Sequence, residues 1–242
     1  MKKFLFSLAL LISTVATKAQ VVTFNIGFEN PPYTVGFIGA GNFEGQDHWT
    51  GFGYQFVTNS LAHSGSQSLI TTMDGFVSRR FDNEPSHIMS ISKAEDWYME
   101  AWAYVLPGSS SIPATFEPAS GLGGAFYISV YGDGRIDFNS GAALNQRAAN
   151  PNLLNKWLRL RIEHPAYDLN LEMSIVGDGV NETFSGYYNT PWNPSILAFG
   201  GPTAFWDDVY AVSGALPAVP EPSTAALVGL GLLGLGCRLR RR

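Results

Sequence analysis

The chain of 242 residues is 45% hydrophobic and only 14% charged, and it contains 26 glycines and 16 phenylalanines. This length gives room for one domain of ordinary size, and the composition excludes a disordered protein. Few charges together with many aromatic and glycine residues favour β-structure over a coiled coil or a helical bundle.

The formal net charge of −5 averages three unlike segments. Residues 1–19 and residues 217–242 each carry a net charge of +3, whereas the middle of the chain holds 8 basic and 19 acidic residues. A domain this acidic lacks the basic surface that displaces counterions from nucleic acid. We therefore expect no nucleic-acid partner, and rather a neutral ligand or a divalent cation.

The first 19 residues have the order of a secretory signal peptide. Lys2 and Lys3 precede an apolar stretch over residues 4–12, and small residues lead to Ala19. Cleavage after Ala19 leaves Gln20 as the new N-terminus. An uncleaved anchor helix is the alternative, but the apolar stretch is short for one. The segment predicts export.

The C-terminal segment, residues 217–242, consists of a proline-rich stretch, an apolar run and a cluster of arginines. We expect an apolar helix over residues 224–237, about 21 Å long against a hydrocarbon core of about 30 Å, and therefore a weak transmembrane anchor. The positive-inside rule places the arginines in the cytoplasm and the preceding domain outside. The single cysteine, Cys237, lies in this run, so the exported domain has no disulfide. The arginines are Arg238, Arg240, Arg241 and Arg242.

The proline-rich stretch contains Val219, Pro220, Glu221 and Pro222. Its prolines favour an extended, accessible segment that a processing enzyme can reach. The order of proline motif, apolar run and arginines resembles the PEP-CTERM sorting signal of exported bacterial proteins. The resemblance implies an exosortase as partner, which processes the protein near the Pro-Glu-Pro element while it is anchored in the inner membrane, for delivery to the cell surface or the exterior. A plain proline linker before a tail anchor is the alternative.

The middle of the chain, residues 20–216, is the predicted exported domain. Its segments 157–163 and 169–175 alternate between apolar and polar residues and are joined by a turn, which predicts an antiparallel pair of half-buried strands. Segments 125–131 and 135–139 flank the turn Gly132-Asp133-Gly134 in the same way. Many short strands separated by such turns predict an all-β domain with a β-sandwich architecture.

Four short motifs allow a finer comparison: Gly27-Phe28-Glu29, residues 64–69, the strand 97–105, and residues 206–210. Together they resemble jelly-roll carbohydrate-binding modules, and concanavalin A-like sandwiches share much of the pattern. The resemblance implies a jelly-roll sandwich. It also implies that Glu29 and Asp208, with Asp207 beside them, hold a structural calcium ion, for which hard oxygen ligands are suited. In the alternative reading, the two aspartates are solvated residues at a strand edge.

Signatures of catalysis are weak in this sequence. Glu95, Asp96 and Glu100 are the nearest match to the acidic motif of laminarinase-type enzymes. However, Asp96 and Glu100 lie about 13 Å apart along a strand, outside the window of about 5–9.5 Å for paired glycosidase carboxylates. The histidines, His164 among them, form no metal-binding or hydrolase motif and fit surface or turn positions. We therefore expect no enzyme.

Tyr98, Glu100, Trp102 and Tyr104 occupy the outward positions of the strand 97–105, whose odd positions are apolar. Aromatic rings beside a carboxylate can stack on a sugar ring and accept hydrogen bonds from its hydroxyl groups. Alternatively, these residues pack under a long loop such as residues 36–53. The sequence predicts an exported surface or extracellular-matrix protein that binds glycan. A purely structural surface protein is the second interpretation, and a glycoside hydrolase is the third.

Overall fold

The computed structural model describes residues 21–39, 45–53, 55–72, 75–80, 96–108, 112–119, 126–165, 168–188, 196–201 and 204–213. They belong to a compact unit that runs from Ala19 to Gly214. The predicted signal peptide, the proline motif, the apolar helix 224–237 and the arginine cluster lie outside the described residues. No helix in the described part of the chain is long and apolar enough to cross a membrane.

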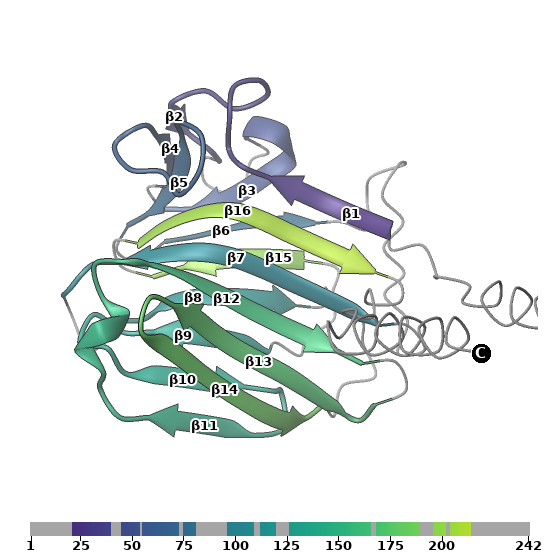
Figure 1. The fold of residues 1–242 in the computed structure, drawn as a ribbon. Helices are drawn as coiled ribbons and strands as arrows, with labels where there is room; N and C mark the ends of the chain where they lie inside the picture. Colours follow the sequence, from purple (N-terminus) through teal and green to yellow (C-terminus); the bar gives the residue numbers. More distant parts are fainter. Residues whose placement is uncertain are drawn as a thin grey trace, which may run out of the picture. The chain divides into compact units, whose positions relative to one another are not determined.

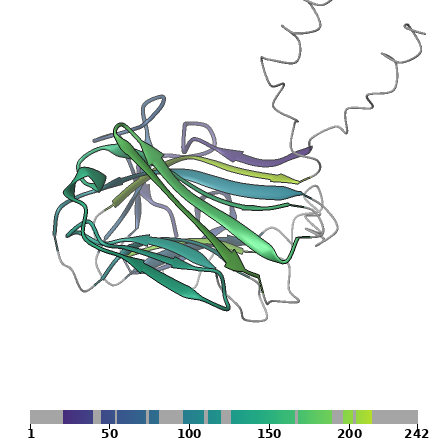
Figure 2. The same cartoon turned by 60° about the horizontal axis from the view of Figure 1, so that its bottom comes forward.

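Two antiparallel sheets form the compact unit, so the predicted all-β sandwich is confirmed (Figures 1 and 2). In spatial order the nine-stranded sheet comprises β14 (Val180–Tyr187), β13 (Asn170–Gly177), β12 (Trp157–His164), β7 (Trp97–Val105), β16 (Ala204–Ser213), β5 (Ser68–Thr71), β4 (Phe56–Thr58) and β2 (Gly36–Phe37), with β1 (Val21–Ile26) also paired to β16. The seven-stranded sheet comprises β11 (Leu144–Arg147), β10 (Ile136–Asn139), β9 (Tyr127–Val130), β8 (Ala114–Ala119), β15 (Ile196–Gly200), β6 (Phe76–Arg80) and β3 (Trp49–Phe52). Two 3-10 turns, η1 (Gln46–His48) and η2 (Pro151–Leu153), complete the described elements.

Both predicted strand pairs are present in the structure. β12 and β13 pair antiparallel, with Leu160 opposite Ile175, and β9 and β10 flank the predicted turn. β7 has the predicted bounds, and its side chains alternate regularly between buried and half-buried positions. Period-2 patterns in these segments therefore identified both the strands and the faces that they bury.

Aromatic side chains fill the space between the two sheets. Trp49, Trp97 and Trp206 are fully buried. The ring of Phe199 lies 4.7 Å from Trp206 and 5.8 Å from Trp49, measured between ring centroids. Burial of rings this large supplies much of the hydrophobic stabilisation that a domain without disulfides requires.

His164 is a correction to the sequence analysis, which expected a surface or turn position. The residue is fully buried, and its ring stacks on Trp97 at 5.7 Å with an interplanar angle of 12°. β12 continues through residue 164, so strand alternation turns His164 inward together with Leu160 and Ile162. Its Nε2 lies 3.0 Å from the carbonyl oxygen of Asp168, at the start of the next strand segment.

β16 lies at a fork in the nine-stranded sheet. One of its edges pairs with β7 along most of its length, whereas the other pairs with β5 over Ala204–Trp206 and with β1 over Val209–Ser213. The register against β7 shifts between Asp207 and Tyr210, and Asp208 has a left-handed φ of 44°. One extra residue in β16 therefore forms a β-bulge at the fork.

Candidate functional site

The outer face of the nine-stranded sheet, which points away from the seven-stranded sheet, carries the four residues that were predicted to bind ligand. Tyr98, Glu100, Trp102 and Tyr104 are all half-buried, while the residues between them in β7 are buried in the core. The predicted outward orientation of these four side chains is therefore confirmed. Whether they bind a ligand stays a prediction.

Trp102 is covered by a side chain from a distant part of the chain. The ring of His63 stacks on Trp102 at 3.9 Å with an interplanar angle of 14°, and the ring of Trp157 meets His63 edge-on at 5.4 Å. The covering segment is the loop 63–67, which we call the clamp loop. The sequence analysis had considered a loop for this role, but a different one, at residues 36–53.

Tyr98 and Glu100 are engaged by one arginine on the neighbouring strand β12. The guanidinium of Arg161 lies 3.8 Å from the centroid of the Tyr98 ring and 3.4 Å from a carboxylate oxygen of Glu100. It also contacts the carboxylate of Glu163 at 2.6 Å. The positive charge of Arg161 is therefore paired with carboxylates of the protein itself.

The three carboxylates that were predicted to bind calcium converge on the clamp loop. Glu29 accepts hydrogen bonds from the backbone N–H groups of Ser66 and Gln67 and from the Ser66 hydroxyl, at 2.7–2.8 Å. Asp208 lies 2.6 Å from Nδ1 of His63 and accepts a hydrogen bond from the Ser64 hydroxyl at 2.7 Å. The bulge in β16 makes this convergence possible, because adjacent residues of a regular strand point to opposite faces.

Asp207 is fully buried and accepts hydrogen bonds from three backbone N–H groups, those of His63, Ser64 and Asp208. Burial nevertheless raises the pKa of this carboxyl to about 6, against the lowering effect of these hydrogen bonds. For Glu29, burial also acts to raise the pKa, but the hydrogen bonds from Ser66 and Gln67 outweigh it and lower the pKa. Asp207 is therefore not a solvated edge residue.

The calcium site was tested against this donor set. The oxygens of all three carboxylates already accept hydrogen bonds from N–H or O–H groups of the clamp loop, and Asp207 accepts a further one from the backbone N–H of Asp208. No group of three metal-ligating side chains occurs among the residues that the structure describes. The arrangement can hold the loop without a cation, and calcium stays a prediction.

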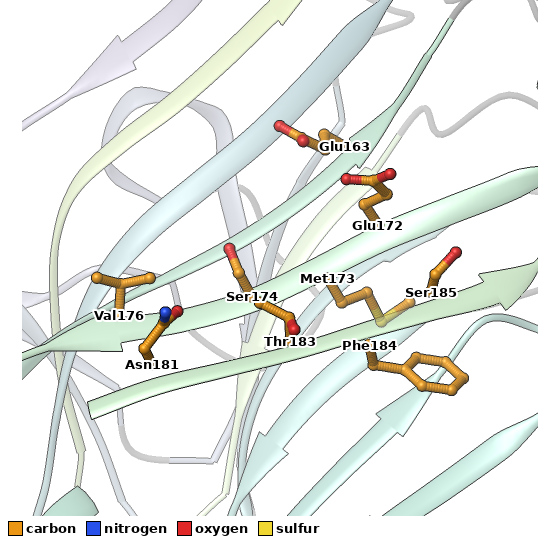
Figure 3. A pocket seen from close by; sticks show the side chains of 9 residues that line it. All are labelled: Glu163, Glu172, Met173, Ser174, Val176, Asn181, Thr183, Phe184 and Ser185. Carbon is orange, nitrogen blue, oxygen red and sulfur yellow. The ribbon is translucent and has the colours of Figure 1, made fainter.

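A groove of about 500 Å³ lies over β12, β13 and β14 on the same outer face (Figure 3). Figure 3 shows the carboxylates of Glu163 and Glu172 close together at one end, and Val176 and Asn181 at the other. We call it the polar groove, since carboxylate, hydroxyl and amide groups make up most of its lining. The lining residues are Glu163, Glu172, Met173, Ser174, Val176, Asn181, Thr183, Phe184 and Ser185.

A continuous row of large apolar side chains crosses six strands of the outer face, and we call it the aromatic row. Each member lies directly opposite the next on the neighbouring strand, and the neighbours of each in its own strand are mostly core residues. With strands about 4.8 Å apart, the row is about 24 Å long. Its members are Trp157, Tyr104, Phe205, Ile70, Phe56 and Phe37.

The aromatic row is partly open to solvent. Phe37 at its end is 52% exposed, Phe205 in its middle is 8% exposed, and the other members lie between these values. Ring contacts link the row, with 5.6 Å between Tyr104 and Trp157 and 4.5 Å between Phe37 and Phe56. The sequence analysis identified only Tyr104. Alternation in each strand could have placed the other members on the outer face, but only strand pairing aligns them.

A second hollow, of about 510 Å³, lies on the outer face of the seven-stranded sheet over β6, β15 and β8. Small residues such as Ala198 and Gly200 line it together with Phe76 and Ile196. Glu117 is its single charged lining residue, and burial raises the pKa of that carboxyl. This hollow offers far fewer hydrogen-bonding groups than the polar groove.

Comparison with known proteins concerns the tail and the fold separately. Residues 218–242 match the family model described as the PEP-CTERM protein-sorting motif. The chain carries a PEP-CTERM sorting signal. This signal marks an exported protein that is sorted at the membrane and processed by an exosortase, as the resemblance predicted. The signal contains the predicted Pro-Glu-Pro element and the four terminal arginines.

No curated protein matches the chain in sequence. Among solved structures, the binding domain of botulinum neurotoxin DC, in complex with rat synaptotagmin II, matches with a TM-score of 0.50 at 12% identity, over 81% of this chain and 49% of that one. Domain 4 of a GH43 extracellular arabinanase from Geobacillus stearothermophilus, in complex with arabinotriose, matches with a TM-score of 0.47 at 15% identity, over 81% and 94%. Arcelin-5, a lectin-like defence protein from Phaseolus vulgaris, matches with a TM-score of 0.45 at 9% identity, over 83% and 100%.

These structural matches concern the fold. The chain spans about half the length of the neurotoxin binding domains that it matches. The ligand has to be inferred from the chain's own residues, because a shared fold does not imply a shared function.

Proposed function

We propose that this exported protein is a component of the bacterial cell surface or extracellular matrix, and that it binds polysaccharide on the outer face of its nine-stranded sheet. The observation that carries the proposal is the side-by-side arrangement of the polar groove and the aromatic row on one sheet face. A polysaccharide needs both kinds of surface, because its rings have apolar faces and its rims carry hydroxyl groups.

The polar groove supplies the hydrogen-bonding part of the proposed site. Its carboxylates accept hydrogen bonds, its serine and threonine hydroxyls both donate and accept, and the Asn181 amide does both as well. Sugar hydroxyl groups need this mixture of donors and acceptors. Figure 3 shows these side chains spread along β12, β13 and β14, from Glu163 and Glu172 at one end to Val176 and Asn181 at the other.

The aromatic row supplies the stacking part. Trp157 joins the two regions, since Val176 at one end of the groove lies opposite Arg159, two residues after Trp157 in β12. A row of about 24 Å is longer than a single sugar ring, which favours a polymer over a monosaccharide.

A glycan microarray tests the proposal, with the purified protein in mild detergent as the probe. We expect binding to a restricted set of polysaccharides. Trp157→Ala should weaken that binding, whereas Phe76→Ala should not, because Phe76 is a 49% exposed aromatic residue on the opposite sheet. A protein that binds no glycan would instead be the purely structural surface component of the second interpretation.

One observation bears on the glycoside hydrolase interpretation. Glu163 and Glu172 lie directly opposite each other on β12 and β13, close enough in the strand register to form a carboxylate pair. A general acid needs surroundings that disfavour its charge. Glu172 is exposed and Glu163 is paired with Arg161, so neither has such surroundings. We therefore propose a binding protein, and release of reducing sugar from a bound polysaccharide would contradict this.

A further inference from the structure

Two arginines of β12 point to the same outer face but differ in their contacts. Arg161 is paired with Glu100 and Glu163 and lies over Tyr98. The Arg159 side chain makes no hydrogen bond, ion pair or ring contact with any residue that the structure describes, and its Nε is buried without a hydrogen-bond partner. Several other side-chain atoms in the described part of the chain are also buried without a partner, among them the Nε of Arg79, but Arg79 is ion-paired with Asp47 through its Nη1. The lack of any side-chain partner makes Arg159 a candidate for a bound group.

The cross-strand neighbours of Arg159 include no carboxylate that could pair with its charge. Trp102 on β7 and Val176 on β13 lie directly opposite it, and neither side chain can accept a hydrogen bond from it. Glu163 lies four residues further along the same strand, about 13 Å away. Asp207 lies two strands away, and its oxygens are occupied by backbone N–H groups.

The place of Arg159 on the face is equally specific. Val176, its neighbour on β13, lines one end of the polar groove, together with Asn181 (Figure 3). Trp157, two residues earlier in β12, begins the aromatic row. A chain that occupied both regions would therefore pass directly over Arg159.

We infer that Arg159 binds a carboxylate group of the polysaccharide, so that the ligand contains uronic acid units; this inference rests on the proposed function. A guanidinium presents a rigid planar fork of N–H donors that fits a carboxylate in a bidentate manner. A carboxylate that binds the terminal Nη groups, which are not among the buried atoms, would neutralise a partly desolvated charge.

The charges around the site limit how acidic the ligand is. Glu163 and Glu172 lie at the other end of the polar groove, and the exported domain is acidic as a whole. A densely charged polyanion would be repelled there. A single carboxylate bound at Arg159 would lie about 13 Å from Glu163, which exceeds the Debye length of about 8 Å at physiological ionic strength, so the repulsion between these two charges is largely screened. The ligand that fits has isolated carboxylates among neutral sugars.

Titration of the full-length protein in detergent with glucuronate tests the inference, with the Nε–H resonance of Arg159 observed by NMR. We expect this resonance and the indole N–H of Trp102 to shift with glucuronate and not with glucose. Arg159→Gln should abolish the Trp102 shift. Arg135→Gln, which removes a charge from an arginine paired with Asp133 in the turn between β9 and β10, should leave it intact.

The same variants on the glycan microarray separate this inference from the proposed function. We expect Arg159→Gln to weaken binding to uronate-containing polysaccharides about tenfold or more. Binding to the carboxyl-reduced forms of the same polysaccharides should not change. If the wild-type protein bound the uronate-containing polysaccharides and their carboxyl-reduced forms equally well, the role of Arg159 would be overturned and glycan binding would remain in place. Absence of binding to every glycan would overturn both. A stronger response to glucose 6-sulfate than to glucuronate would reassign the anionic group and contradict the carboxylate.

Discussion

Trp102 is half-buried because a loop side chain covers it, while the core lies on the other side of its strand. Its neighbours Ala101 and Ala103 are fully buried, and its own ring stacks on His63 outside the sheet. The stacking keeps a flat indole ring oriented along the face that we propose as the binding site.

Trp102→Ala should therefore leave the protein folded. We expect a loss of about 0.5–1.5 kcal/mol in the free energy of unfolding, which corresponds to an aromatic pair contact. Trp206→Ala is the matched control one strand away, and it should cost about 3–5 kcal/mol because Trp206 is fully buried in the core. Urea unfolding of both variants measures the difference. Equal losses would place Trp102 in the core.

Glu29 distinguishes the hydrogen-bonded clamp from a calcium site. If its hydrogen bonds to Ser66 and Gln67 hold the clamp loop, Glu29→Ala should lower the melting temperature equally in calcium and in a chelator. If calcium holds the loop, the variant should lose stability only when calcium is present, since a ligand stabilises just the state that binds it. We expect the first result. A wild-type melting temperature that rises with calcium and a variant that does not respond would establish the metal site.

At the scale of the elements, local patterns predicted several of the strands that are long enough to show alternation, although the eight-residue β14 was not identified. β7, β12 and β13 contain eight or nine residues each, and their buried faces follow directly from the sequence. β2 and β4 contain only two and three residues, too few for a period to be recognised. The bulge in β16 was equally invisible, because nothing in Asp207-Asp208 itself signals an extra residue.

The candidate site was predicted only in part for the same reason. Outward positions within one strand were correct, but the aromatic row and the clamp loop arise from pairing between distant segments. Phe37, Phe56 and Phe205 belong to three different strands, and their alignment depends on the register of the whole sheet. Arg159 looked like an ordinary polar residue of an amphipathic strand, and only its missing partner distinguishes it.

Gly65 tests the clamp loop as an element. It has a φ of +62°, and a Cβ at this position would come within 2.4 Å of a Glu29 carboxylate oxygen. Gly179, in the turn between β13 and β14, has a φ of +71° and open space around it. Both Ala substitutions carry the backbone cost of about 1–2 kcal/mol, but only Gly65→Ala should also displace the loop. We expect a clearly lower melting temperature for Gly65→Ala, and similar values for both variants would contradict the clamp.

At the scale of the whole molecule, the chain combines an acidic domain with two basic ends. The sorting signal explains the C-terminal end, because it marks an exported protein that is sorted at the membrane. We propose that the exported domain acts outside the cell, where its outer sheet face can meet polysaccharide.

Replacement of Pro220, Glu221 and Pro222 by alanine tests the sorting signal. The apolar run and the arginines remain, so we expect a protein that still reaches the membrane but accumulates there unprocessed. Cell fractionation with immunoblotting measures the size and place of the product. Normal processing of the variant would show that the Pro-Glu-Pro element is not what the enzyme recognises.

The central claim is that polysaccharide binds to the outer face of the nine-stranded sheet, and the indole N–H resonances of the tryptophans test it most directly. Trp102 and Trp157 lie on that face, whereas Trp49, Trp97 and Trp206 are buried between the sheets. When a polysaccharide identified on the microarray is added, we predict chemical-shift changes at Trp102 and Trp157 and none at the three buried residues. Binding that leaves Trp102 and Trp157 unchanged would contradict the account.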